Sequence, residues 1–107
     1  MLALLLGTLA AAAPANLGVA EREWHVNPYA TSVRRGAVTL YVHNYGEDAH
    51  DLQVRGPRGF QSRVTEPIEP GATATLAVRL RRPGIYRLLC TLPHHAALGM
   101  RATIRVR

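Results

Sequence analysis

Hydrophobic and polar residues alternate along most of this chain with the two-residue period that is typical of β-strands. Turn residues such as Gly and Pro separate the alternating runs, and no segment keeps a helical period of 3.6 residues for three turns. Six runs rich in Val, Ile, Leu, Thr and Tyr carry the pattern, at residues 19–26, 37–45, 50–55, 73–81, 84–90 and 100–107, with a weaker run at 60–64. The pattern predicts an all-β fold, a Greek-key antiparallel β-sandwich of about six to eight strands in two sheets.

Alternation also predicts which side chains face the core, because successive residues of a strand point to opposite faces of a sheet. Three core-facing positions, each at a predicted strand end, carry unusual chemistry: His50, Cys90 and Met100. His43 falls on an outward-facing position. In residues 19–26, taken as one strand, His25 faces outward in register with Glu21 and Glu23, whereas Trp24 faces the core.

The first fifteen residues, MLALLLGTLAAAAPA, have no charge and run from a Leu-rich segment into small residues. The segment is too short to span a bilayer, which takes about twenty apolar residues. Ala13-Pro14-Ala15 matches a signal-peptidase site, although no basic residue precedes the apolar run. We therefore expect a signal peptide at residues 1–15, a mature domain at 16–107 without a membrane span, and a periplasmic or otherwise extracytoplasmic location. The alternative is a buried N-terminal strand or helix.

Charge and cysteine content limit the partners. The 107 residues suit one small domain, and all thirteen basic residues are arginine, giving a net charge of +6. The arginines are scattered along the predicted strands without a basic stripe or aromatic platform, so we expect no nucleic-acid partner. The scattered arginines favour a solvated outer face on a monomer. The alternative is that they form a surface that docks an acidic protein. The single cysteine cannot form an internal disulfide, and metal ligation would explain a free thiol in an exported protein.

The segment CTLPHHAALGM concentrates metal-binding chemistry, with Cys90, His95 and Met100 spaced C-x4-H-x4-M. Together with His50, it offers a thiolate, two imidazoles and a thioether. These soft ligands argue against Mg²⁺, Ca²⁺ and Mn²⁺, and structural zinc sites usually contain more cysteines. Two histidines, one cysteine and a weak axial methionine form the blue-copper arrangement. Each residue alone would be an ordinary core residue, but their shared parity and spacing favour a copper site.

Two stretches of the chain carry a family resemblance: VTLYVHNYGEDAHDLQV, and IEPGATATLAVRLRRPGIYRLLCTLPHHAALGMRATIRV. They resemble the cupredoxins, small blue copper proteins such as plastocyanin and azurin. The resemblance implies one type 1 copper ion held by His50, Cys90, His95 and an axial Met100. It also implies supporting roles for Asn44 and for Asp51, which stands where the family often has Asn and would tie the two ligand loops together. His94 stands where the family often has Gly, so it is either a residue at a positive φ or a second candidate ligand.

The resemblance implies a one-electron carrier that passes electrons through the edge of His95 to a redox protein, such as a cytochrome or a copper enzyme. The docking surface would consist of Pro93, His94, Ala96, Ala97 and Leu98. A copper-delivery module without redox turnover and a metal-free interaction domain are the alternatives. We do not expect an enzyme, because a copper enzyme needs a second copper with further histidines or an open coordination position. The remaining His25, His43 and His94 lie on different elements and mostly face outward, and Met100 would close the first site.

Overall fold

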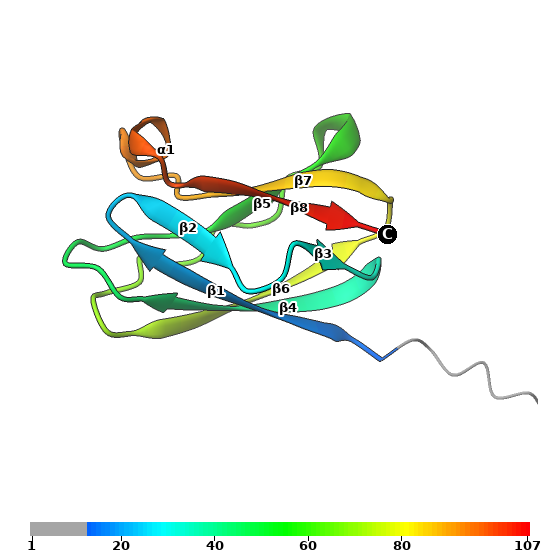
Figure 1. Ribbon diagram of the computed structural model, residues 1–107, viewed down its shortest axis with the longest axis horizontal. Coiled ribbons are helices and arrows are strands. Elements are labelled where there is room, and N and C mark those ends of the chain that lie inside the picture. The colour runs from blue at the N-terminus through cyan, green and yellow to red at the C-terminus, as the bar shows by residue number, and fades with distance from the viewer. Residues whose placement is uncertain (1–12) are drawn as a thin grey trace, which may run out of the picture.

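The computed structural model describes residues 13–107, which form two four-stranded sheets packed face to face (Figure 1). The strand orders are β2-β1-β4-β6 and β3-β8-β7-β5, which confirms the predicted sandwich. Two short helical segments, η1 (Pro57–Gly59) and α1 (His95–Leu98), lie in loops. The strands are β1 (Ala15–Arg22), β2 (His25–Pro28), β3 (Ser32–Val33), β4 (Gly36–Asn44), β5 (Gln53–Arg55), β6 (Thr73–Leu80), β7 (Gly84–Leu89) and β8 (Arg101–Val106).

Two strand pairings are parallel, although the sequence predicts antiparallel pairing. β1 pairs with β4 and β3 pairs with β8 in parallel, whereas the other four pairings are antiparallel. The chain turns back after β1 to form β2, crosses to the second sheet as β3, and returns to the first sheet as β4. Hydrophobic alternation reports the face that a side chain occupies and carries no information about strand direction.

The first predicted strand is wrong, because residues 19–26 form a hairpin instead of one strand. β1 and β2 are antiparallel, with Arg22 opposite His25, so that Glu23 and Trp24 make the turn. This turn contains none of the Gly, Pro, Asn or Asp residues that usually signal one. Glu21, expected to face outward, is completely buried instead, because it has the parity of the β1 core residues.

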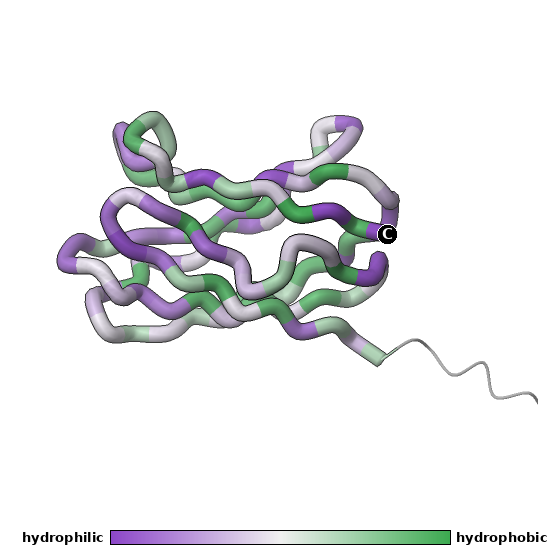
Figure 2. The backbone as a smooth tube through the Cα atoms, viewed as in Figure 1, coloured by the Kyte–Doolittle hydropathy of each residue, from purple (hydrophilic) through white to green (hydrophobic). Residues whose placement is uncertain are grey.

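The core lies between the two sheets and contains the inward-facing residues of both. The side chains that the sequence placed on the inner face of β4 are buried, as predicted: Val38, Leu40, Val42 and Asn44. Opposite them, β7 and β8 contribute Tyr86, Leu88, Ile104 and Val106. Figure 2 shows the resulting alternation of hydrophobic and hydrophilic positions along the strands.

The predicted strand at residues 50–55 is shortened to β5, and His50 makes only an isolated bridge with Ile68. The run at 60–64 forms a single bridge through Gln61 and no strand. No helix within residues 13–107 is long and apolar enough to cross a membrane. Most of the predicted signal peptide, residues 1–12, lies outside the described part of the chain, and Ala15, its last residue, begins β1.

Candidate metal centre

Strand ends bring three of the predicted site residues to one end of the sandwich. Cys90 follows β7 directly and Met100 precedes β8, and these two strands are antiparallel neighbours. The backbone N–H of Cys90 donates to the carbonyl of Met100 at 3.1 Å. His50 precedes β5, which pairs with β7 on its other side. The sheet register thus places residues 40 positions apart in the sequence against one another.

The loop between Cys90 and Met100 folds back through the single turn of α1. The N–H of Met100 donates to the carbonyl of His95 at 3.1 Å, and the N–H of Leu98 donates to the carbonyl of His94 at 3.0 Å. His94 has a φ of +69°, the left-handed conformation that glycine adopts most readily. This turn directs the His95 ring toward Cys90 and leaves His94 exposed.

His50, Cys90 and His95 form a compact group of potential metal ligands. Nδ1 of His50 lies 3.2 Å from Nδ1 of His95, and Sγ of Cys90 lies 3.4 Å from the same nitrogen. The three donor atoms all lie within 4.8 Å of one another. His50, Cys90 and Met100 are completely buried, and Met100 contacts His50. His94 is not part of this group, so the structure brings only the second of the paired histidines to it.

The surroundings of Cys90 suit a thiolate bound to a soft cation. Burial raises the pKa of the free thiol to about 11, although the backbone N–H of Asp51 opposes this by donating to Sγ at 3.4 Å. A buried thiol is therefore neutral unless a cation displaces its proton. The carboxylate of Asp51 also accepts from the N–H of Thr91 at 2.5 Å and from its hydroxyl at 2.6 Å. Asp51 thus joins the segment that contains His50 to the one that contains Cys90.

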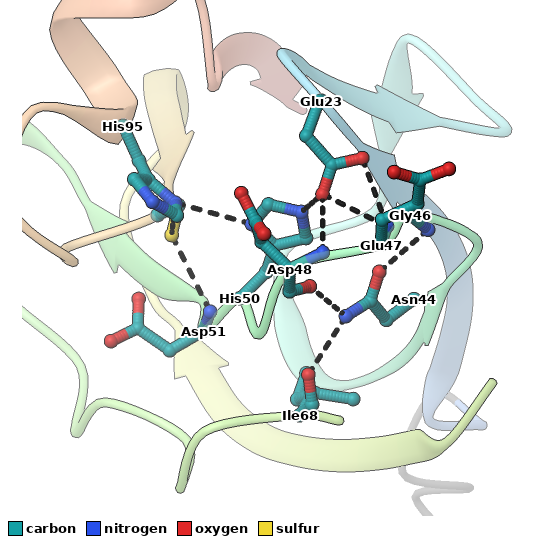
Figure 3. Close-up of polar contacts among 10 residues, drawn as sticks. Glu23, Asn44, Gly46, Glu47, Asp48, His50, Asp51, Ile68 and His95 are labelled. Carbon is teal, nitrogen blue, oxygen red and sulfur yellow. Dashed lines mark hydrogen bonds and ion pairs between the residues drawn. The ribbon is translucent and has the colours of Figure 1, made fainter. Parts of the chain in front are cut away.

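Asn44 holds the loop that leads to His50 (Figure 3). Its amide nitrogen donates to the carbonyls of Asp48 and Ile68, both at 2.8 Å, and its amide oxygen accepts from the N–H of Gly46 at 2.8 Å. These three bonds fix the loop against the segment that pairs with His50, so Asn44 supports the ring without touching the donor group.

Sequence reasoning missed Glu23, which contacts His50 from the turn between β1 and β2 (Figure 3). Its Oε1 lies 2.9 Å from Nε2 of His50, and it also accepts from the N–H groups of Glu47 and Asp48 at 2.7 to 3.0 Å. Partial burial raises the pKa of this carboxyl, but hydrogen bonds from Asp48, Glu47, its own backbone and His50 outweigh that effect and lower the pKa to about 2. Glu23 is therefore an anion at neutral pH.

Trp24, the other residue of this turn, lies over both imidazoles. Its ring centroid is 4.9 Å from that of His95 and 6.4 Å from that of His50, in edge-to-face arrangements. Trp24 packs against the core, as the sequence predicted, but at the metal end of the sandwich. Nothing in the sequence indicated this position, because it depends on the unpredicted hairpin.

The other histidines lie apart from the donor group. His25 is exposed on β2. His43 is paired with Thr73, its Nδ1 lying 2.6 Å from the hydroxyl oxygen. A metal site needs several His, Cys, Asp or Glu side chains close together. Within residues 13–107, the group of three or more that meets this condition is His50, Cys90 and His95.

A buried thiol and two imidazole nitrogens, converging beside a methionine at one end of a two-sheet sandwich, define a small copper protein and fit one type 1 copper ion. A model of the family described as copper binding proteins, plastocyanin/azurin family, matches residues 15–107. The chain therefore belongs to the plastocyanin/azurin family of copper-binding proteins, the cupredoxins.

Solved structures share the fold at low sequence identity. Reduced auracyanin from the photosynthetic bacterium Roseiflexus castenholzii is 20% identical, with a TM-score of 0.66 over 91% of this chain and 98% of its own. Auracyanin B is 19% identical, with a TM-score of 0.70 over 89% of both chains. Auracyanin A, a blue copper protein from Chloroflexus aurantiacus, is 16% identical, with a TM-score of 0.63 over 88% of this chain and 99% of its own. No curated protein matches the sequence.

Proposed function

We propose that this protein is an extracytoplasmic one-electron carrier that holds a single copper ion and is not an enzyme. The observation that carries the proposal is the convergence of the His50, Cys90 and His95 donor atoms in a group that is largely closed to solvent. Bound copper would supply a centre that cycles between Cu(I) and Cu(II). The surrounding hydrogen bonds would hold the ligands in one arrangement for both states, which reduces the rearrangement that accompanies each electron transfer.

Each ligand has a distinct role in this proposal. The two Nδ1 atoms and the Cys90 thiolate would hold the copper ion, with the thioether of Met100 as a weaker fourth ligand. Asn44 and Asp51 would hold the ligand loops. Asn44 does so through its hydrogen bond to the carbonyl of Asp48, and Asp51 through the hydrogen bond that it accepts from the N–H of Thr91. Because the chain itself fixes the loops, we expect the ligands to hold their arrangement without the metal.

Electrons would enter and leave through the surface around His95. Of the proposed docking residues, Pro93, His94, Ala97 and Leu98 are exposed and Ala96 is half-buried, and Leu98 is 54% exposed. This small, mostly apolar surface suits the brief encounters of electron-transfer proteins. The partner would be a redox protein such as a cytochrome or a copper enzyme, and the excess of arginine favours an acidic one.

The test of the copper site is titration of residues 16–107 with Cu(II), followed by visible spectroscopy. We expect an intense thiolate-to-copper charge-transfer band, which Cys90→Ser, His50→Ala and His95→Ala each abolish. His94→Ala is the matched control and should keep the band, because His94 lies outside the donor group. A wild-type protein without this band would contradict the proposal.

A second measurement separates electron transfer from copper delivery. A carrier should pass through repeated cycles of oxidation and reduction while releasing copper slowly to a chelator. A delivery module should transfer its copper to the chelator rapidly. The complete burial of His50, Cys90 and Met100 favours slow release.

A further inference from the structure

The carboxylate of Glu23 contacts His50 on the side of the ring that faces away from the donor group. Its Oε1 lies 2.9 Å from Nε2, and the His50 side chain is fully buried, whereas that of Glu23 is 23% exposed. A carboxylate can only accept a hydrogen bond, so Nε2 carries the hydrogen. The lone pair of Nδ1 then faces Cys90 and His95. The contact therefore selects the tautomer that a ligand at this position needs.

Glu23 is in turn held by the loop that leads to His50. Its two oxygens accept from the N–H of Glu47, both at 3.0 Å, and Oε1 accepts from the N–H of Asp48 at 2.7 Å. Gly46 leaves the room that the carboxylate occupies, since a Cβ at this position would lie 2.5 Å from Oε2. The carboxylate cannot turn away from His50 without losing these bonds, so it fixes the orientation of the ring as well as its tautomer.

We propose that Glu23 is a positioning residue of the copper site, which fixes the tautomer of His50 and lowers the reduction potential of the bound metal. The inference rests on the proposed role of His50 as a ligand. A negative charge hydrogen-bonded to the distal nitrogen makes the imidazole a more basic ligand. It stabilises Cu(II) more than Cu(I), because the interaction with the negative charge grows with the charge of the ion. The alternative is that Glu23 only holds the loop.

A pair of charge-removing variants separates the two roles. Glu23→Gln keeps the size of the side chain and an amide oxygen that accepts from Nε2, but removes the charge. Glu47→Gln is the matched control, because it removes the same charge from an exposed side chain of the same loop. In a redox titration we expect Glu23→Gln to lower the ratio of Cu(II) to Cu(I) affinity about tenfold, a rise in potential of about 59 mV for one electron. Glu47→Gln should change the potential far less.

The tautomer is measured without any metal, by ¹⁵N NMR of His50. The wild-type protein should show a hydrogen on Nε2 and none on Nδ1, whereas Glu23→Ala should show both tautomers and bind copper ten- to a hundredfold more weakly. Gly46→Ala tests the contact without altering Glu23, because the added methyl group displaces the carboxylate. Like Glu23→Gln, Gly46→Ala should raise the reduction potential. If the Glu23 variants fold poorly, this variant still tests whether the carboxylate acts on His50.

Equal potentials in Glu23→Gln and Glu47→Gln, or an unchanged His50 tautomer in Glu23→Ala, would overturn this inference while leaving the proposed function intact. A wild-type protein that binds no copper would instead overturn the proposed function, and the NMR measurement on the metal-free chain would still decide the tautomer.

Discussion

Glu21 carries a carboxyl group that is buried in the core without a hydrogen-bond partner for either oxygen within residues 13–107. Burial, together with the nearby charge of Asp51, raises the pKa of this group to about 8. A neutral acid costs far less to bury than a carboxylate, so Glu21 keeps its proton at neutral pH.

We predict that Glu21 makes the protein less stable as the pH rises. The carboxyl loses its proton near pH 4.5 in the unfolded chain and near pH 8 in the folded one, so unfolding releases a proton between these values. The contribution of Glu21 to stability is therefore fully present below about pH 4.5 and is lost up to about pH 8, by at most about 1.4 kcal/mol per pH unit. Glu21→Gln is neutral in both states and lacks this loss, so the difference in stability between the two proteins should shift in favour of the variant from pH 5 to pH 8.

Urea denaturation at several pH values, with both proteins in the same metal state, measures this difference. The exposed Glu66→Gln is the control and should follow the wild type at every pH. Parallel curves for Glu21→Gln and the wild type would contradict the prediction.

At the scale of elements, the sequence predicted correctly which strand residues face the core, because this depends on hydrophobic alternation. It did not predict the hairpin, where the chain turns without the usual turn residues. Strand parity placed His50, Cys90 and Met100 on the core face, and all three are buried. The hairpin at Glu23 and Trp24 could not be predicted, because neither residue favours a turn and the contacts that hold it, to His50 and His95, span long stretches of sequence. The parallel pairing of β1 with β4 was equally beyond the pattern, since it depends on how the chain crosses between the sheets.

The loop between β7 and β8 offers a prediction at this scale, because His94 has the left-handed conformation that disfavours residues with a Cβ. His94→Gly should relieve that strain and stabilise the protein by up to about 1 kcal/mol, an effect reduced by the greater freedom of glycine in the unfolded chain. Thermal unfolding measures the change, and visible spectroscopy should show an unaltered copper band. Loss of the band would mean that the His94 side chain belongs to the site.

At the scale of the whole molecule, the distribution of charged residues bears on how a redox partner would approach the metal site. The chain has thirteen arginines and seven acidic residues, and two of the acidic ones, Glu23 and Asp51, contact the donor group. Arg101 lies beside the proposed docking surface and donates to the carbonyl of Ala96 at 3.0 Å. Arg35 lies at the opposite end of the sandwich, where β4 begins.

This arrangement predicts that electron transfer to an acidic redox protein slows as salt is added, because screening weakens the attraction that guides the two surfaces together. Arg101→Gln should reduce the bimolecular rate several-fold at low ionic strength and flatten its salt dependence, whereas Arg35→Gln should leave the rate close to that of the wild type. Stopped-flow mixing of the reduced protein with an acidic cytochrome measures both effects, after the visible band has shown that each variant keeps its site. Equal rates for the two variants would place the encounter away from His95, because a partner that docks there must pass close to Arg101 and far from Arg35.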